Sequence, residues 1–307
     1  MRTALVVGLI VSATATAREF RVPVGRSDLY AREIGRGQPI IVLHGGPDFD
    51  HSYFLPDMDR LSDSYRLLYY DQRGRGRSAA GVEPEDVTME SEVADLDKVR
   101  QYFHLDRAAI LGHSWGAVLA LEYVLRHPDR VSQLILMNPA PASAADFAQM
   151  RKERPARLGA DLDRLRAIAA TDKFKDGDPD TVAALYRIHF KPALARSADL
   201  DKVMASLRAS FTKEGILKAR KIEDRLTDDT WASAKGYDLL PKLAAVRVPA
   251  IVISGDHDFI PADTASHIAR AIPGARLVTL KDCGHFSYLE CPGAVRKELD
   301  EFFQQGK

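Results

Sequence analysis

The sequence predicts an α/β fold in which a mostly parallel central sheet carries helices on both faces and a helical cap is inserted before the last strands. Three features of the 307-residue chain lead to this prediction. Short apolar runs end at Gly, Pro or Asp, as buried strands do where they enter loops. Stretches with helical spacing of apolar residues separate these runs, and such alternation implies parallel pairing. The alternation stops at about residue 140 and resumes near residue 248.

The elements follow one another in a regular order. Apolar runs predict strands at residues 39–43, 65–70, 107–111, 131–137, 248–254 and 276–280. Helical spacing predicts helices over residues 88–103, through Leu125, near 261–272, and in the stretch that carries Val295, Leu299, Phe302 and Phe303. Residues 140–234 show helical periodicity without a run typical of a strand. We therefore expect an α/β core formed by residues 18–139 and 235–307, with a helical cap at 140–234.

The charge balance of the chain excludes some classes of partner. Forty-three basic residues balance forty-three acidic ones, and no basic stripe interrupts this balance. Such a chain has no long-range field that would attract nucleic acid or an anionic membrane. We expect a small molecule or a short peptide as the substrate. The sequence leaves the oligomeric state open.

The first seventeen residues resemble a leader. A positive start at Arg2 precedes an unbroken apolar run from Ala4 to Val11, and small residues lead to Ala15-Thr16-Ala17. This order of features is typical of a signal peptide that is cleaved before Arg18. The run is shorter than the ~20 apolar residues that span a bilayer. We expect export after cleavage; the alternative is a cytoplasmic protein whose first strand is this run.

A serine flanked by glycines lies between a predicted strand and a predicted helix. The segment Gly112-His113-Ser114-Trp115-Gly116 fits the pattern G-x-S-x-G. That pattern describes a very tight turn in which the serine hydroxyl projects above the sheet and the flanking positions carry no side chain. The pattern alone also arises by chance, but the strand before it and the helix after it are the setting that it requires. We predict Ser114 as a nucleophile.

A serine nucleophile needs a base and a group that orients the base. Asp258 follows the strand at 248–254, and His285 follows the strand at 276–280. The chain order Ser, Asp, His is one of the known orders for such a triad. Asp256 competes with Asp258 for the acidic role. We favour Asp258 because it lies further past the carboxyl end of the strand, where open α/β sheets bind ligands.

Two backbone N–H groups are expected to stabilise the oxyanion of the reaction. The loop His44-Gly45-Gly46-Pro47 follows a predicted strand, and Trp115 follows the nucleophile. In this arrangement the N–H groups of Gly46 and Trp115 form the oxyanion hole. We interpret His44 as a structural hydrogen-bonding residue. The glycine-rich segment 71–78 lacks a phosphate-binding pattern, and we interpret it as a turn that braces the oxyanion loop.

The two cysteines, Cys283 and Cys291, lie on either side of His285. An exported protein permits a disulfide between them. Bridging requires Cα atoms about 4.4–6.8 Å apart, which a sequence does not reveal. We favour two reduced, buried thiols, since cysteine is often simply buried. Because no His/Cys spacing typical of a metal site is present, we expect neither a metal nor a cofactor.

Together these motifs resemble the prolyl iminopeptidase-like branch of the α/β hydrolases. The resemblance rests on His44-Gly-Gly-Pro47, Asp71-Gln-Arg-Gly-Arg-Gly-Arg-Ser78, Gly112-His-Ser-Trp-Gly116, Gly255-Asp-His-Asp258 and Gly284-His285. It covers the chain after the leader, except for the cap. It implies the three roles given above and an enzyme that removes N-terminal residues, preferentially proline, from short peptides. One position departs from the family loop His-Gly-Gly-Pro-Gly, since Asp48 replaces the last glycine.

Two substrate classes follow from these residues. An aminopeptidase needs carboxylates that pair with the substrate ammonium; the candidates are Asp48, Glu214, Glu223 and Asp224. A carboxylesterase or small-amide hydrolase instead needs an apolar pocket; the candidates for its lining are Phe147, Phe174, Tyr186, Phe190, Phe211 and Trp231. A non-catalytic binding protein is disfavoured by the complete set of reactive parts.

Overall fold

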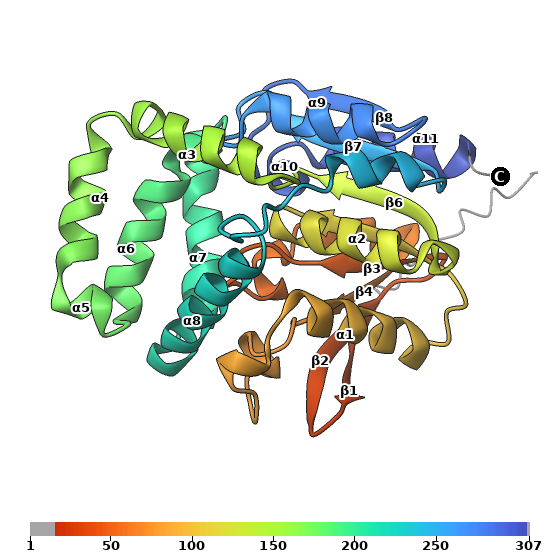
Figure 1. Ribbon diagram of the computed structural model, residues 1–307, viewed down its shortest axis with the longest axis horizontal. Helices are drawn as coiled ribbons and strands as arrows, with labels where there is room; N and C mark the ends of the chain where they lie inside the picture. The colour runs from red at the N-terminus through yellow and green to blue at the C-terminus, as the bar shows by residue number, and fades with distance from the viewer. Residues whose placement is uncertain (1–15, 306–307) are drawn as a thin grey trace, which may run out of the picture.

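Eight strands form one sheet at the centre of the computed structural model, which describes residues 16–305 (Figure 1). They are β1 (Arg18–Val24), β2 (Ser27–Ile34), β3 (Gln38–Leu43), β4 (Tyr65–Tyr70), β5 (Ala108–His113), β6 (Val131–Met137), β7 (Ala250–Gly255) and β8 (Arg276–Leu280). Their spatial order is β1-β2-β4-β3-β5-β6-β7-β8. β1 pairs antiparallel with β2, and β2 with β4, whereas all other neighbours are parallel. The predicted fold class is confirmed.

The hairpin of β1 and β2 is the part of the sheet that the sequence did not predict. It turns at Gly25, whose φ of 67° suits a residue without a side chain. Both strands carry charged residues on their exposed positions, so neither forms the continuous apolar run that marks a buried parallel strand. The expected leader lies almost wholly outside the described residues, of which Ala17 directly precedes β1.

Helices cover both faces of the sheet. One face packs against α1 (Met89–Tyr102), α2 (Trp115–Arg126) and α9 (Ala262–Ala271), and the other against α10 (Ser287–Glu290) and α11 (Pro292–Gln305). Adjacent strand residues alternate between these faces, since Ile41 packs with the first group and Ile40 with the second. Among the described residues, no helix combines the length and apolar character that crossing a bilayer requires.

Six helices connect β6 to β7 and project from one end of the sheet (Figure 1). They are α3 (Ala144–Leu158), α4 (Asp161–Ala170), α5 (Asp172–Lys175), α6 (Pro179–Phe190), α7 (Leu200–Ser210) and α8 (Lys213–Asp229). Several begin at a side chain that caps the first turn: Ser143 caps α3, Asp178 caps α6 and Thr212 caps α8. We refer to residues 144–229 as the helical segment.

The two ends of the helical segment meet at its base. Ser143 and Asp238 form an isolated antiparallel bridge. On either side of this bridge, the Ala144 N–H donates to the Tyr237 carbonyl at 2.7 Å, and the Leu239 N–H donates to the Ala142 carbonyl at 2.9 Å. The chain therefore leaves the sheet after β6 and returns towards β7 through one narrow, hydrogen-bonded neck.

Candidate active site

Ser114 occupies the tight turn between β5 and α2. Its φ of 55° and ψ of −121° are rarely adopted by a residue with a side chain. The glycines on either side explain how the turn closes. A Cβ atom at Gly112 would lie 2.3 Å from the Gly116 carbonyl oxygen, and one at Gly116 would lie 2.3 Å from the Leu43 carbonyl oxygen. Both positions therefore require glycine.

The loop after β3 lies directly against this turn. A Cβ atom at Gly45 would approach the Cβ of Ser114 to 2.9 Å. The next residue, Gly46, has a φ of 119°, and a Cβ atom there would lie 2.2 Å from the backbone nitrogen of Asp48. Gly46 and Ser114 line the same cavity. Trp115 is the first residue of α2, so its N–H has no acceptor within the helix.

Asp258 bonds His285, and His285 lines the same cavity as Ser114. The His285 Nδ1 lies 3.0 and 3.1 Å from the two carboxylate oxygens of Asp258, and both side chains are buried. Asp256 points elsewhere: its carboxylate bonds the ring of His257 at 2.7 Å and accepts from the Cys283 N–H. The structure therefore brings Asp258, and not Asp256, to the histidine.

Asn138 fixes the Asp258 carboxylate from the far side. Its amide donates to Asp258 at 2.8 Å and to the Gly284 carbonyl at 3.0 Å, while its oxygen accepts from the Ser287 hydroxyl at 2.6 Å. The Ile260 N–H also donates to Asp258 at 2.9 Å. Asn138 has a φ of 47°, in the left-handed region that asparagine tolerates better than most residues. Sequence reasoning missed Asn138; the signal was its position directly after β6.

A chain of hydrogen bonds joins the Gly45 loop to the histidine loop. The Gly45 N–H donates to the Tyr53 hydroxyl at 2.7 Å, and that hydroxyl lies 2.7 Å from the Nδ1 of His113. The Nε2 of His113 lies 2.8 Å from the His285 carbonyl oxygen. Burial, together with the charge of His285, lowers the pKa of His113, so its ring is neutral. A neutral ring accepts from Tyr53 and donates to the carbonyl.

His44 has the structural role that its sequence position indicated. Its Nε2 accepts from the Gln72 N–H at 3.0 Å, and its carbonyl accepts from the Gln72 amide at 2.8 Å. Complete burial and the charge of Arg75 lower its pKa to about 3. The neutral ring thus ties the loop after β3 to the loop after β4.

Two cavities meet at Ser114. The smaller has a volume of about 90 Å³ and reaches towards His285 and Phe286. The larger has a volume of about 380 Å³ and extends beneath α3 and α8. Five residues line both cavities: Gly46, Ser114, His189, Glu223 and Phe259. A substrate bound across Ser114 would therefore have one part in each.

Carboxylates line the smaller cavity. Asp48 accepts a hydrogen bond from the Tyr186 hydroxyl, and Glu223 of α8 lies at the same cavity. Burial, reinforced by the charge of Asp48, raises the pKa of Glu223 to about 8. Burial also raises the pKa of Asp48. Two carboxyl groups in one small cavity thus resist ionising together, and a bound cation would lower their pKa values and favour the ionised forms.

The other predicted substrate-binding acids are placed differently. Glu214 is exposed in the first turn of α8 and lines neither cavity at Ser114. Nine residues of helix, about 13 Å of rise, separate it from Glu223. The structure therefore does not support Glu214 as a binding residue. Asp224 is exposed and lines only the larger of the two cavities.

Aromatic rings surround both cavities, and about half of them were predicted. Tyr186 and Phe190 line the smaller cavity, and Phe147 and Trp231 line the larger, with these two rings stacked at 4.2 Å. Phe211 lines neither, and Phe174 packs against another cluster of the helical segment. The rings that sequence reasoning missed are Phe49, Tyr53, Phe259 and Phe286. They follow strands or turns, where no periodicity marks them.

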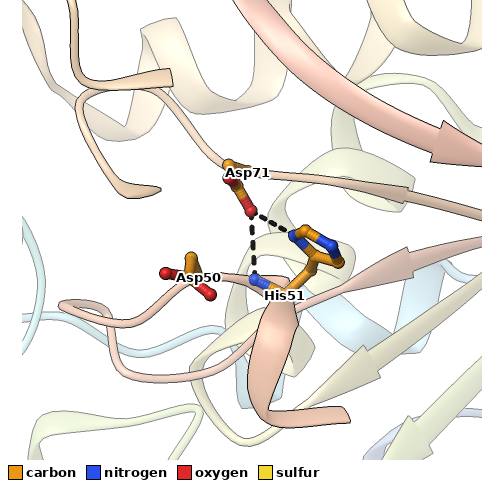
Figure 2. A group of neighbouring side chains, drawn as sticks. All are labelled: Asp50, His51 and Asp71. Carbon is orange, nitrogen blue, oxygen red and sulfur yellow. Dashed lines mark hydrogen bonds and ion pairs between the residues drawn. The ribbon is translucent and has the colours of Figure 1, made fainter. Parts of the chain in front are cut away.

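A buried acidic group braces the loop after Gly46. Figure 2 shows the ring and the backbone N–H of His51 both directed at one oxygen of Asp71, at 2.5 and 3.1 Å, with Asp50 beside them. The other oxygen of Asp71 accepts from the Arg77 N–H at 2.8 Å. Burial alone would raise the pKa of Asp71. The charge and the hydrogen bond of His51 outweigh this effect, so the pKa of Asp71 is lowered.

The same group has the composition of a metal site. One ligand atom from each of Asp50, His51 and Asp71 lies within 4.8 Å of the others, as do those of the exposed group Asp256, His257 and Asp282. Both oxygens of Asp71, however, already accept hydrogen bonds from the protein. These contacts fit the interpretation of segment 71–78 as a structural brace.

The expectation of two reduced thiols is wrong. Cys283 and Cys291 form a disulfide, with Cα atoms 6.2 Å apart and eight residues of separation. This Cα distance lies within the range that bridging tolerates. The bond closes the loop that carries His285. The short helix α10 brings the second cysteine back to the first, which the sequence spacing alone did not reveal.

The chain matches a known protein family over most of its length. A family model described as "alpha/beta hydrolase fold" matches residues 38–292. The chain is 28% identical to a proline iminopeptidase of Lactobacillus crispatus over 297 residues, covering 92% of this chain and 98% of that protein. The predicted resemblance to proline iminopeptidases is confirmed.

Solved structures show the same fold. A proline iminopeptidase of Mycobacterium smegmatis superposes with a TM-score of 0.69 at 23% identity, covering 94% of this chain and 98% of that one. Est816, described as an N-acyl homoserine lactone degrading enzyme, superposes with a TM-score of 0.67 at 20% identity, covering 92% and 99%. At this identity the likeness shows the fold alone. With the match across residues 38–292, it follows that the chain belongs to the α/β-hydrolase family.

Proposed function

We propose that the protein is a serine hydrolase that works through an acyl-enzyme intermediate. His285 Nε2 takes the proton of the Ser114 hydroxyl as Oγ bonds to the substrate carbonyl carbon. Asp258 holds the imidazole through Nδ1 and stabilises the imidazolium. The imidazolium then gives its proton to the leaving group as the scissile bond breaks. A water molecule, deprotonated by the same histidine, releases the acyl group and regenerates Ser114.

The oxyanion of each tetrahedral intermediate needs preorganised donors. The N–H groups of Gly46 and Trp115 are the candidates, since the Gly45–Gly46 loop lies against Ser114 and Trp115 begins α2. Both N–H groups lie in tight turns, and the glycine positions of these turns have no room for a side chain. Such fixed dipoles cost no reorganisation as charge develops.

We propose that the substrates are short peptides with a free N-terminus. The observation that carries this proposal is the carboxyl pair of Asp48 and Glu223 in the small cavity beside Ser114. A substrate ammonium there would neutralise a pair whose pKa values are raised in its absence. The limited volume of about 90 Å³ suits one small N-terminal residue, such as proline. The likeness to proline iminopeptidases supports the same substrate class.

A carboxylesterase is the second candidate. The rings of Phe147 and Trp231 give the larger cavity an apolar wall, which would suit an aryl or alkyl ester. This cavity does not require a charged amine, so the two candidates differ in their dependence on the N-terminus.

The test compares three substrates: a proline arylamide, its N-acetylated form, and a short-chain aryl ester. Acetylation should reduce kcat/KM about ten- to a hundredfold, since a charge-assisted hydrogen bond contributes about 1.5–3 kcal/mol. Asp48→Asn and Glu223→Gln should produce a similar loss for the free amine and little loss for the acetylated form. Glu214→Gln is the matched control, because it removes the same charge from the same helix away from the cavity.

The aminopeptidase proposal fails if acetylated and free substrates are cleaved equally well. It also fails if the aryl ester is a far better substrate than both amides and is unaffected by Asp48→Asn. In that case the protein is an esterase on the same scaffold.

We also propose that the helical segment acts as a cap and that residues 1–17 are removed on export. Helices α6 and α8 contribute walls to both cavities at Ser114, and α3 contributes a wall to the larger, as a cap would. Mass spectrometry of the protein secreted by an expressing bacterium tests the leader, with a mature N-terminus at Arg18 expected. Recovery of the full-length chain in the cytoplasm would contradict export.

A further inference from the structure

Three arginines of α3 line the larger cavity beside Ser114. Arg151, Arg154 and Arg157 follow one another at intervals of three residues, so they lie along one side of the helix. The formal net charge of the chain is zero, so this concentration of positive charge is local. Of the acidic residues, Glu223 and the exposed Asp224 line the same cavity from α8.

The arginines differ in the partners they already have. Arg157 pairs with Glu153 at 3.0 Å and donates to the Asp258 carbonyl at 3.1 Å, which holds it in place. Within residues 16–305, neither Arg151 nor Arg154 has a carboxylate oxygen within 4 Å. Arg151 lies over the Phe147 ring, at 5.9 Å from its centre.

Arg154 is oriented by a neutral partner. Its guanidinium donates to the Nδ1 of His189 at 3.1 Å, and His189 lines both cavities. Burial and the charge of Arg154 lower the pKa of His189 to about 3, so the ring accepts this hydrogen bond without carrying charge. A guanidinium has five N–H donors in a planar fork. One bond to His189 leaves the others available to a ligand.

The charged groups around Ser114 are therefore unevenly divided between the two cavities. Asp48 lines only the smaller cavity, the arginines of α3 line only the larger, and Glu223 lies where the two cavities meet and lines both. We propose that the larger cavity binds a carboxylate on the leaving group through Arg154 and Arg151, and that dipeptides with a free C-terminus are the preferred substrates. This inference rests on the proposed serine hydrolase function and deepens it.

A dipeptide matches both charges at once. Its ammonium would pair with the carboxyl groups, its scissile carbonyl would face Ser114, and the carboxylate of the leaving amino acid would face the guanidinium groups. Arginine binds carboxylates in a bidentate geometry that lysine does not reproduce. A longer peptide or an amide leaving group would place a neutral group at the same arginines.

The experiment compares two substrates that differ only in that carboxylate: Pro-Gly and Pro-Gly amide. For the unchanged protein, kcat/KM should be about tenfold higher for Pro-Gly, the lower end expected for a charge-assisted contact, because Arg151 and Arg154 are exposed to water. The preference should shrink as ionic strength rises, since salt screens exposed charges.

Variants locate the contact. Arg154→Gln and Arg151→Gln should reduce kcat/KM for Pro-Gly more than kcat/KM for Pro-Gly amide and proline arylamide, so that the preference for Pro-Gly shrinks. Arg154→Lys should keep part of the preference, because it retains the charge but loses the fork. Lys152→Gln is the matched control: it removes one positive charge from the same helix at an exposed position that lines neither cavity.

The result that overturns the inference is equal kcat/KM for Pro-Gly and its amide in the unchanged protein. An equal loss for both substrates in Arg154→Gln also overturns it, because that pattern would indicate a structural role. Failure of the proposed aminopeptidase activity looks different, since neither peptide would be cleaved. The butyryl esters of glycolate and glycolamide then supply the same pair of charged and neutral leaving groups, and equal rates for these two esters would again refute the carboxylate site.

Discussion

Replacing Asn138 should show how much its hydrogen bond to Asp258 contributes to activity, beside what its three hydrogen bonds contribute to stability. The Asn138 amide makes three buried hydrogen bonds, one of them to the carboxylate of Asp258. Asn138→Gly removes all three without adding strain, because glycine tolerates the φ of 47°. Asn138→Ala removes the same bonds and adds a left-handed alanine.

The expected magnitudes follow from these contacts. One charge-assisted bond and two neutral bonds are lost, so Asn138→Gly should lower the free energy of unfolding by about 2.5–6 kcal/mol. Asn138→Ala should lose about 1 kcal/mol more, the cost of its backbone conformation. Both variants should lose about ten- to a hundredfold in kcat/KM, because Asp258 loses the bond that fixes its carboxylate against His285.

Urea unfolding and initial rates on proline arylamide measure the two effects. Ser287→Ala is the control, since it removes the hydroxyl bonded to the Asn138 oxygen but leaves the amide on Asp258. Its kcat/KM should stay within about twofold of the unchanged protein. The reasoning is refuted if Asn138→Gly keeps its activity, or if Ser287→Ala loses as much activity as Asn138→Gly does.

Three further predictions concern the nucleophile, Glu223 and the disulfide. Ser114→Ala should lower kcat by a factor on the order of 10⁵–10⁶ with an unchanged Tm, and more than a tenth of the original rate would remove Ser114 from the mechanism. The pKa of Glu223 is raised from 4.5 to about 8, so its contribution to stability is complete below about pH 4.5 and is lost as the pH rises towards 8. Relative to Glu223→Gln, the unchanged protein should lose about 1–2 kcal/mol of unfolding free energy across this window, since Glu223 is partly exposed; parallel profiles would contradict the shift. Replacing both Cys283 and Cys291 by serine should cost about 2.5 kcal/mol, the loop-closure entropy for their separation of eight residues, and thiol titration of the unfolded chain without reductant should detect no free thiol.

The sequence was sufficient for the parallel part of the sheet and for Ser114. Strands β3 to β8 each contain a short apolar run, and the G-x-S-x-G pattern marks a backbone turn in which both glycines are sterically required. The hairpin of β1 and β2 lacked such a run. β1 carries charged residues at exposed positions, and the buried residues of β2 are interrupted by Arg32 and Glu33, so neither strand shows the apolar pattern of its neighbours.

The surroundings of the site could not be read from the chain. Asn138 contacts residues more than a hundred positions away, and Tyr53 bonds His113 across sixty. No local pattern records such contacts. Glu214 and Glu223 are equivalent as sequence, and only the packing of α8 over the sheet directs one of them to the cavity. The same holds for the cysteines, whose distance depends on a turn of helix between them.

The narrow neck at the base of the helical segment bears on how such proteins acquire new specificities. Because Ser143 and Asp238 close the segment on itself, a different insertion could be grafted there without re-registering β6 or β7. The graft would still have to replace the contacts that hold the histidine loop. The Ala193 carbonyl accepts from the His285 N–H at 2.7 Å, and Glu290 accepts from both the Gly284 and the Ala195 N–H groups. Divergence of the insertion is therefore constrained where residues 193–195 hold the histidine loop, and where side chains of the segment bond the core, as Arg157 does at the Asp258 carbonyl and Lys218 at the Val82 carbonyl.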